Sequence, residues 1–187
     1  MAIQDTVRVL NRMVAETVID GYALAGAVAA YNYIEPTVTD DLDVLVAFGP
    51  SPAGLLVTLE PIIAWLRSAG HREFHHEGII IEGWTVQFLP VAGPLDAEAL
   101  EQAITIELDR GGQAAPARIV RAEHLVAKAL EVGRPKDFTR VAQFLDEGAV
   151  DMARLNGVLE RFGLVERWNA FRRRAGIPDP PVGGSVP

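Results

Sequence analysis

The fold is decided by residues 24–48, LAGAVAAYNYIEPTVTDDLDVLVAF. This stretch ends in an apolar run, Leu42 to Phe48, which predicts a buried β-strand. Asp41 and Asp43 lie two residues apart where that strand begins. Because side chains at positions i and i+2 of a strand share a face, we expect both carboxylates to project together from one sheet edge. Such a pair offers oxygen ligands to Mg²⁺ or Mn²⁺. Proteins commonly bind Mg²⁺ together with the phosphates of a nucleotide. The alternative interpretation is two solvated acids at the entry to a strand.

The composition narrows the class of protein. The chain has 187 residues and is 49% hydrophobic, which suits one domain, or one core domain with a helical appendage. It contains no cysteine, which excludes disulfides and thiolate metal sites. No stretch approaches the roughly 18–20 apolar residues of a membrane span, and the first 20 residues lack a signal-peptide layout. We therefore expect a soluble, cytoplasmic protein without a membrane partner.

The charge balance bears on nucleic acids. A net charge of −8 argues against a general nucleic-acid-binding surface, but it is compatible with a nucleic-acid substrate met through a local basic patch. Such a cluster is formed by Arg167 with Arg172, Arg173 and Arg174. Its simplest interpretation is a solvated helix end, where cations complement the helix dipole.

Hydrophobic periodicity predicts the remaining elements of the first 120 residues. We expect helices at 2–20 (stopped by Gly21), 27–33, 53–69 and 96–103, and strands at 22–25, 78–82, 85–89, 104–108 and 117–120. The short Gly-containing turn after residue 82 favours an antiparallel hairpin. The Gly-Pro-Ser-Pro sequence at 49–52 and the Gly pair at 111–112 are expected to be turns.

The second half of the chain has a different character. Residues 122–174 are predicted to form successive helices, and the segment 176–187 contains four prolines, which is typical of a mobile tail. The predicted class is α+β: a small mixed β-sheet flanked by helices, followed by a C-terminal helical bundle. We assign the α/β core to residues 1–120, the helical region to 121–175 and the tail to 176–187.

The segment around Asp41 resembles the minimal nucleotidyltransferase fold, including the group of AbiEii-like toxins. In that family a Gly-Gly or Gly-Ser pair begins a short helix, and an Arg-x-Thr-x-Asp-x-Asp segment leads into a strand. Gly26 and Ala27 match the first pair, and Thr39, Asp41 and Asp43 match the second segment. The resemblance implies that Asp41 and Asp43 hold one or two Mg²⁺ ions and that the backbone at the helix start binds the triphosphate of a nucleotide.

Physical chemistry makes sense of this pattern independently. A small residue at a helix start lets phosphates approach backbone N–H groups that have no partner in the helix and lie at its positive end. The hydroxyl of Thr39 is suited to bond the local backbone and hold the approach to the strand in shape. Bound metal would neutralise the triphosphate and align an acceptor hydroxyl with the α-phosphate.

A second match lies in the helical half. Lys128 is followed by Arg134, Lys136 and Asp137 in the sequence Arg-Pro-Lys-Asp, and many members of the same group carry a Lys-bearing helix before Arg-x-Lys-Asp. The resemblance implies that Lys128 reaches the phosphates and that Lys136 and Asp137 orient it or the substrate. The alternative is structural, because an acid in the first helical turn after a proline is favourable.

Three positions depart from the family pattern. The family's arginine is Thr37, its second Gly or Ser is Ala27, and its third carboxylate is Gln87. A glutamine is neutral and serves neither as general base nor as anionic metal ligand. Glu82 is a nearby acid, but an offset of five positions would turn it away from Gln87 within one continuous strand. Gln87 is retained as a candidate nucleotide contact.

Other motifs carry less chemistry. His71, His75 and His76 form a short histidine run, and on a helix His71 and His75 would share one face and could bind a metal. The flanking glycines instead favour a strand or a solvated loop, and proximity to the nucleotide base is a third option. The chain contains no P-loop, no Gly-x-Gly-x-x-Gly and no Gly-x-Ser-x-Gly.

The sequence thus predicts transfer of a nucleotidyl group from a Mg²⁺-bound nucleoside triphosphate to a hydroxyl of an RNA, a protein or a small molecule. The resemblance adds a toxin–antitoxin or defence setting with a cognate partner protein. The alternatives are a catalytically inactive nucleotidyltransferase fold that binds a nucleotide or a protein, and a plain interaction domain with incidental acids.

Overall fold

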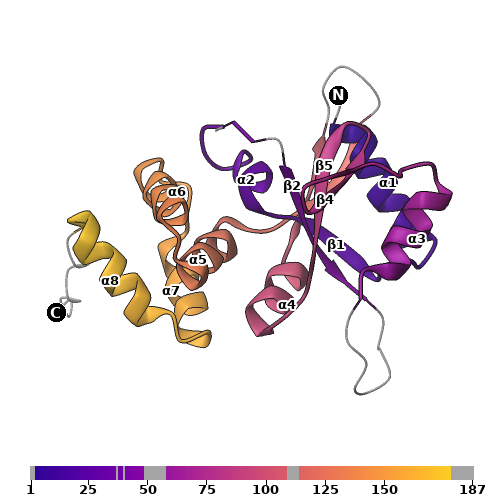
Figure 1. Cartoon of the computed structure of the whole chain (residues 1–187). Coiled ribbons are helices and arrows are strands. Elements are labelled where there is room, and N and C mark those ends of the chain that lie inside the picture. Colours follow the sequence, from indigo (N-terminus) through magenta and orange to yellow (C-terminus); the bar gives the residue numbers. More distant parts are fainter. Residues whose placement is uncertain (1–2, 37, 40, 49–57, 109–113, 178–187) are drawn as a thin grey trace. The chain divides into compact units, whose positions relative to one another are not determined.

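The chain folds into two compact units. The computed structural model describes residues 3–36, 38–39, 41–48, 58–108 and 114–177. Unit 1 comprises Met1–Arg121 and unit 2 comprises Ala122–Pro187. The described part of unit 1 contains a mixed sheet with helices, and that of unit 2 is helical (Figure 1), which confirms the α+β class. Thr37, the expected turns at 49–52 and 111–112, the first residues of the helix expected at 53–69, and the tail from residue 178 lie outside the described residues.

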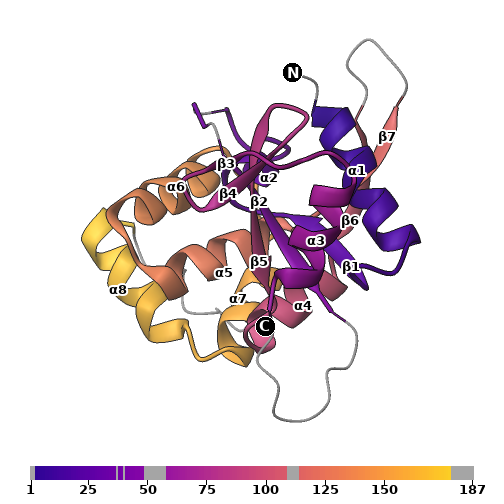
Figure 2. The ribbon, with the colours of Figure 1, turned by 45° about the vertical axis from the view of Figure 1, so that its right-hand side comes forward.

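Within the described residues, seven strands form one sheet in the order β3-β4-β5-β2-β1-β7-β6. Figure 2 shows β3 and β7 toward opposite sides of unit 1. The strands are β1 (Gly21–Leu24), β2 (Asp41–Ala47), β3 (Phe74–His75), β4 (Gly78–Ile81), β5 (Trp84–Pro90), β6 (Ile104–Leu108) and β7 (Ala115–Ile119).

Strand β2 lies in the interior of this sheet. It pairs antiparallel with β1 and parallel with β5. Leu42, Val44 and Val46 are fully buried on one face of β2, which explains the apolar run in the sequence. The expectation that Asp41 and Asp43 project from a sheet edge is wrong, because β2 has a partner on each side; they lie on one face near the start of an interior strand.

Helices cover both faces of the sheet. Figure 1 shows α1 (Ile3–Ala15) and α3 (Glu60–Ser68) on one side and α2 (Gly26–Ala30) and α4 (Pro94–Glu101) on the other. The Tyr22 hydroxyl donates to Asn11 of α1 over 2.8 Å. The Arg118 guanidinium of β7 donates to the Leu100 carbonyl of α4 over 2.6 Å. The face that carries Asp41 and Asp43 is the one that α2 covers in part.

Three helices of unit 1 are shorter than predicted, and the helix expected at 27–33 is α2, which ends at Ala30 and continues as a turn. Helix α1 ends at Ala15 because Thr17 adopts a left-handed conformation with φ 56° and the Val18 amide bonds the Met13 carbonyl, a helix-terminating turn. Gly21, expected to stop this helix, begins β1 instead. Helix α3 begins at Glu60, where the Thr58 hydroxyl accepts a bond from the Glu60 amide.

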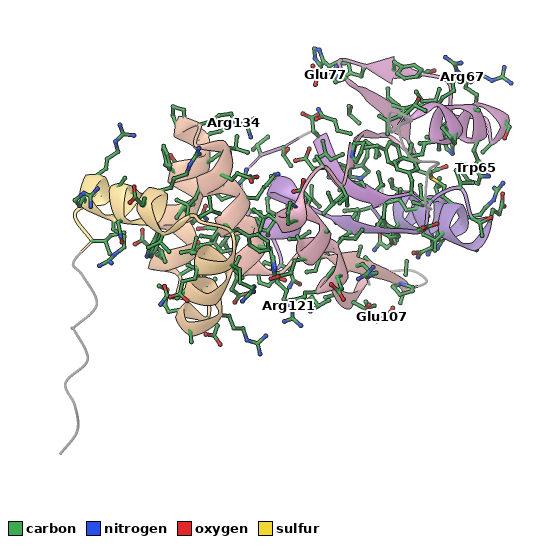
Figure 3. All side chains as sticks on the ribbon, turned by 90° about the horizontal axis from the view of Figure 1, so that it is seen from below. Trp65, Arg67, Glu77, Glu107, Arg121 and Arg134 are labelled. Carbon is green, nitrogen blue, oxygen red and sulfur yellow. The ribbon has the colours of Figure 1, made fainter. Side chains whose placement is uncertain are left out.

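The predicted hairpin is confirmed. Ile81 of β4 faces Trp84 of β5, and the two residues between them, Glu82 and Gly83, both have positive φ, 50° and 88°. That geometry is the tight turn preferred by two-residue hairpins. Strand β3 precedes this hairpin and pairs antiparallel with β4. Figure 3 shows Glu77 in the turn that joins β3 and β4.

The described part of unit 2 contains α5 (Ala122–Val132), α6 (Pro135–Asp146), α7 (Met152–Arg161) and α8 (Val165–Ala175). The Arg167 guanidinium bonds the Leu130 and Glu131 carbonyls at the end of α5. Arg172 is buried and lies 5.9 Å from the Trp168 ring centroid. The expectation that this basic cluster is merely a solvated helix end is therefore wrong for Arg172, which packs in the core of unit 2.

A separate finding concerns membranes. Among the described residues, no helix has the length and apolar character needed to cross one.

Candidate functional site

The candidate site is built on the paired strands β2 and β5. Asp41 pairs in register with Thr85, and Asp43 pairs with Gln87. Residues paired in this way point to the same face of a sheet. Asp41, Asp43, Thr85 and Gln87 therefore share one face, and the neutral Gln87 amide lies directly beside Asp43 on the neighbouring strand.

Gly26 lies directly against the Asp43 side chain. Its φ is +60°, and a Cβ added there would lie 2.8 Å from Cγ of Asp43 and closer still to Oδ2. The Ala25 amide bonds the Asp43 carbonyl over 2.8 Å, which fixes the chain just before α2. The carboxylate therefore lies beside the first residue of α2, where backbone N–H groups favour negative charge. Only glycine permits this close approach.

Thr39 belongs to the segment that leads into β2, and Ala27 follows Gly26 in α2. The Thr39 hydroxyl donates to the Asp41 carbonyl over 3.4 Å, which confirms the expected bond to the local backbone at the entry to β2. Ala27 is buried in the first turn of α2. The structure thus brings Gly26, Ala27, Thr39, Asp41, Asp43 and Gln87 together in unit 1.

The donor set at this place suits Mg²⁺. Within the described ranges there is no group of three or more His, Cys, Asp or Glu side chains that could enclose a metal ion. Mg²⁺ does not need such a group, because it commonly binds through one or two carboxylates, water and substrate phosphates. Asp41 and Asp43 on one face supply two carboxylates, and the rest of the coordination shell would come from phosphate oxygens and water.

Glu82 does not take the place of Gln87. It lies in the two-residue turn between β4 and β5, outside the strand, and its Oε1 is 3.9 Å from Nε2 of His71. The sequence analysis expected Glu82 to point away from Gln87 because of the five-residue offset within one strand. In the structure the two residues are separated because Glu82 lies in the turn before β5.

His75 joins the face of the acidic pair, and sequence reasoning missed this. It lies in β3 rather than on a helix, so the helical metal site considered for His71 and His75 has no basis here. The His75 Nδ1 atom is 3.5 Å from Oγ1 of Thr85, the residue paired with Asp41. A two-residue strand has no detectable hydrophobic period, so no pattern in the sequence predicts this contact.

The remaining predicted residues belong to unit 2. Lys128 extends from α5, is half-exposed, and donates to Glu131 one turn later over 2.8 Å. Arg134 precedes α6 (labelled in Figure 3), and its guanidinium holds both oxygens of Asp137 at 2.8 and 3.2 Å. The Arg134 amide also donates to Asp137, so the pair closes the first turn of α6 reciprocally.

The structure explains Asp137 and Arg134 through helix capping. The Asp137 side chain is 5% exposed, whereas that of Arg134 is 58% exposed. Burial opposes ionisation of Asp137, but the hydrogen bonds and charge of Arg134, together with the charge of Lys136, outweigh it and lower the pKa of Asp137. The roles of Lys128, Arg134, Lys136 and Asp137 toward a nucleotide stay predictions.

Comparison with known proteins gives a limited result. The sequence matches no protein-family model and no curated protein. Among solved structures, the chain is similar to the crystal structure of an antigenic nucleotidyltransferase-like protein from Paracoccidioides brasiliensis. The identity is 14%, the TM-score is 0.46, and the match covers 90% of this chain and 91% of that chain. A likeness of this degree assigns neither a family nor an activity, so the function must be argued from this chain's own residues.

The contact between Gly26 and Asp43 yields a first prediction. Gly26→Ala should displace the Asp43 carboxylate, because the added methyl takes the space of Oδ2. The unfolding temperature of this variant should therefore no longer depend on Mg²⁺. The variant should also lose about 1–2 kcal/mol of stability from the left-handed conformation alone. Thermal unfolding with and without Mg²⁺ measures both effects.

Gly163→Ala is the matched control for this variant. Its φ is +66°, and nothing lies within 4 Å of an added Cβ. It should show the backbone cost alone and keep the Mg²⁺ response. Equal behaviour of the two variants would contradict the assignment of Asp43.

A second prediction concerns pH. Because the folded-state pKa of Asp137 is lowered, its stabilisation is present above the unfolded pKa of about 3.9 and is lost as pH falls through the folded value. Asp137→Asn should therefore lower the free energy of unfolding by about 1 kcal/mol at pH 7, and the difference should shrink below about pH 4. Chemical denaturation across pH 3–8 measures it.

Asp146→Asn, an exposed substitution at the other end of α6, should change stability by less than about 0.5 kcal/mol. If the Asp137→Asn difference stayed constant down to pH 3, the ion pair would not be its cause.

Proposed function

We propose that the chain binds a nucleoside triphosphate together with Mg²⁺ (or Mn²⁺) at Asp41 and Asp43 and transfers its nucleotidyl group to a hydroxyl acceptor. The observation that carries this proposal is the Asp43 carboxylate held against Gly26 at the start of α2. This contact supports the proposal because a carboxylate can bind Mg²⁺ and the backbone N–H groups at a helix start can bind phosphate.

In this arrangement Asp41 and Asp43 would hold the metal ion, and the backbone at Gly26 and Ala27 would bind the β- and γ-phosphates. A metal ion held by these two carboxylates would supply charge neutralisation for the phosphates. The acceptor oxygen forms a bond to that phosphorus, the bond to the bridging oxygen breaks, and pyrophosphate leaves with its electron pair. Thr39 keeps the entry to β2 in place through the Asp41 carbonyl.

The proposal extends to the rest of the chain. On the resemblance alone, Lys128 is assigned to offsetting the phosphate charge, and Arg134, Lys136 and Asp137 are assigned to nucleotide binding. The acceptor is an RNA, a protein or a small molecule. We place the chain in the AbiEii-like group, in a toxin–antitoxin or defence setting with a cognate partner protein, on the resemblance of the two sequence segments alone.

The decisive measurement is calorimetric titration of each of the four nucleoside triphosphates, with and without Mg²⁺. We expect Mg²⁺-dependent binding of at least one nucleotide, because two carboxylates and a triphosphate repel each other without a cation between them. Asp41→Asn with Asp43→Asn should weaken that binding tenfold or more, which corresponds to about 1.4 kcal/mol.

The control removes two exposed charges elsewhere in unit 1, through Asp20→Asn with Glu101→Gln, and should bind as wild type does. Absence of binding to the wild type, or equal binding by both double variants, would refute the proposed site.

A second candidate is a catalytically inactive fold that binds a nucleotide or a partner protein. The pairing of β2 with β5 favours the inactive fold in one respect. Gln87 lies directly beside Asp43, and its side chain is neutral where a third carboxylate would be needed. Under this hypothesis Mg²⁺–nucleotide binding persists while transfer fails for want of a carboxylate.

Substitution of Gln87 separates the two candidates. Pyrophosphate release from nucleoside triphosphate, with water as acceptor, needs no knowledge of the natural acceptor. We expect wild type to release pyrophosphate and Gln87→Asp to stay within about tenfold of it, with Gln87→Asn as the neutral control of the same size; Asp43→Asn should be inert. Release by Gln87→Asp alone would establish the inactive fold.

A further inference from the structure

A histidine lies at the end of a cross-strand row that contains Asp43. His75 of β3 pairs with Gly78 of β4, and Gln87 of β5 pairs with Asp43 of β2. Gly78 lies opposite Gln87, one step beyond the pair Ile79 and Val86. The row therefore crosses four adjacent strands on the face that carries the acidic pair.

Gly78 of β4 has no side chain, which leaves room for the His75 ring to extend across β4 toward β5. A Cβ on Gly78 would lie 2.6 Å from the Cγ2 methyl of Thr85, so the threonine side chain occupies the space that a side chain would need. Thr85 is 7% exposed, and its Oγ1 is 3.5 Å from the His75 ring. The exposed imidazole thus extends from the edge strand to β5, one strand spacing of about 4.8 Å from β2.

Transfer to a hydroxyl requires a group that takes the hydroxyl proton. Gln87 has no basic atom, and Glu82 is held in the turn beside His71. Histidine is the side chain most often used for this task.

We propose that His75 accepts the hydroxyl proton in nucleotidyl transfer. This inference rests on the function proposed above. The acceptor oxygen bonds to the α-phosphorus, its proton passes to Nε2 of His75, and pyrophosphate leaves with the electron pair of the broken bond. Thr85 is a positioning residue: when Nδ1 carries a proton and donates it to Oγ1, the lone pair is on Nε2.

Several titratable groups surround the imidazole. His76 follows it in the chain, with ring centroids 4.1 Å apart, and Glu73 and Glu77 lie two residues before and after it. Asp41 and Asp43 come from β2, whereas Gly78 and Ile80 of β4, Thr85 and Gln87 of β5, and the GAVAA sequence of α2 carry no charge.

The tautomer of His75 is the first test, and it needs neither metal nor nucleotide. Nitrogen-15 NMR of the free protein, at a pH where the ring is neutral, should show the proton of His75 on Nδ1. Thr85→Val should shift the ring toward the Nε2–H form, because the hydroxyl partner is gone. A wild-type ring with its proton on Nε2 would overturn the proposal.

The second test uses pyrophosphate release from Mg²⁺–nucleoside triphosphate with water as acceptor. His75→Gln should lower the rate about 100-fold or more, the usual contribution of a general base, while calorimetric binding of the same nucleotide stays unchanged. Added imidazole should restore part of the activity of His75→Ala, a result that a purely structural role would not give. His71→Gln, a histidine paired with Glu82 instead, should behave as wild type.

Failure of this inference is distinguishable from failure of the proposed function. If wild type binds no Mg²⁺–nucleotide, the proposed function fails and takes this inference with it. If wild type binds the nucleotide but His75→Gln releases pyrophosphate at the wild-type rate, only the role of His75 is overturned. If wild type binds the nucleotide and releases no pyrophosphate, the proposed transfer fails as well.

Discussion

The close approach of the Asp43 side chain to the backbone of Gly26 constrains how β1, α2 and β2 meet in unit 1. It sets the chain into a left-handed conformation at residue 26, while the Ala25 amide bonds the Asp43 carbonyl. The end of β1, the start of α2 and the face of β2 are thereby fixed relative to one another. Because β2 is interior, the same contact also positions Thr85 and Gln87 through the parallel pairing with β5. A larger residue at position 26 would separate these elements.

Local patterns in the sequence predicted the elements well, because strand and helix periods depend on neighbours in the chain. The strand beginning near Asp41 and the β4–β5 hairpin are confirmed, and so is the Thr39 bond. The errors have non-local or conformational causes. Thr17 supplies the left-handed residue that ends α1 early, and the placement of β1 beside β2 makes the acidic strand interior. The pairing of a two-residue strand that brings His75 to Thr85 has no local signature at all.

The two groups of candidate residues differ in how much of their placement folding alone explains. Asp137 and Arg134 form a reciprocal cap, and an ionised carboxylate there stabilises α6 without any ligand. The pair Asp41 and Asp43 instead carries a cost, because two carboxylates on one face of β2 repel each other. An arrangement that costs stability is more informative about function than one that contributes to it.

The neutral residue beside Asp43 changes the electrostatics of transfer without forbidding it. A third carboxylate next to a triphosphate would add repulsion that bound cations must offset. A neutral imidazole adds none, and it becomes a cation when it takes the hydroxyl proton, at the moment when charge develops on the leaving pyrophosphate. Gln87 can still donate its amide hydrogens to a phosphate or sugar oxygen. In the proposed reaction, metal binding and proton acceptance are therefore separate tasks, the first proposed for the carboxylates of β2 and the second for the imidazole of β3.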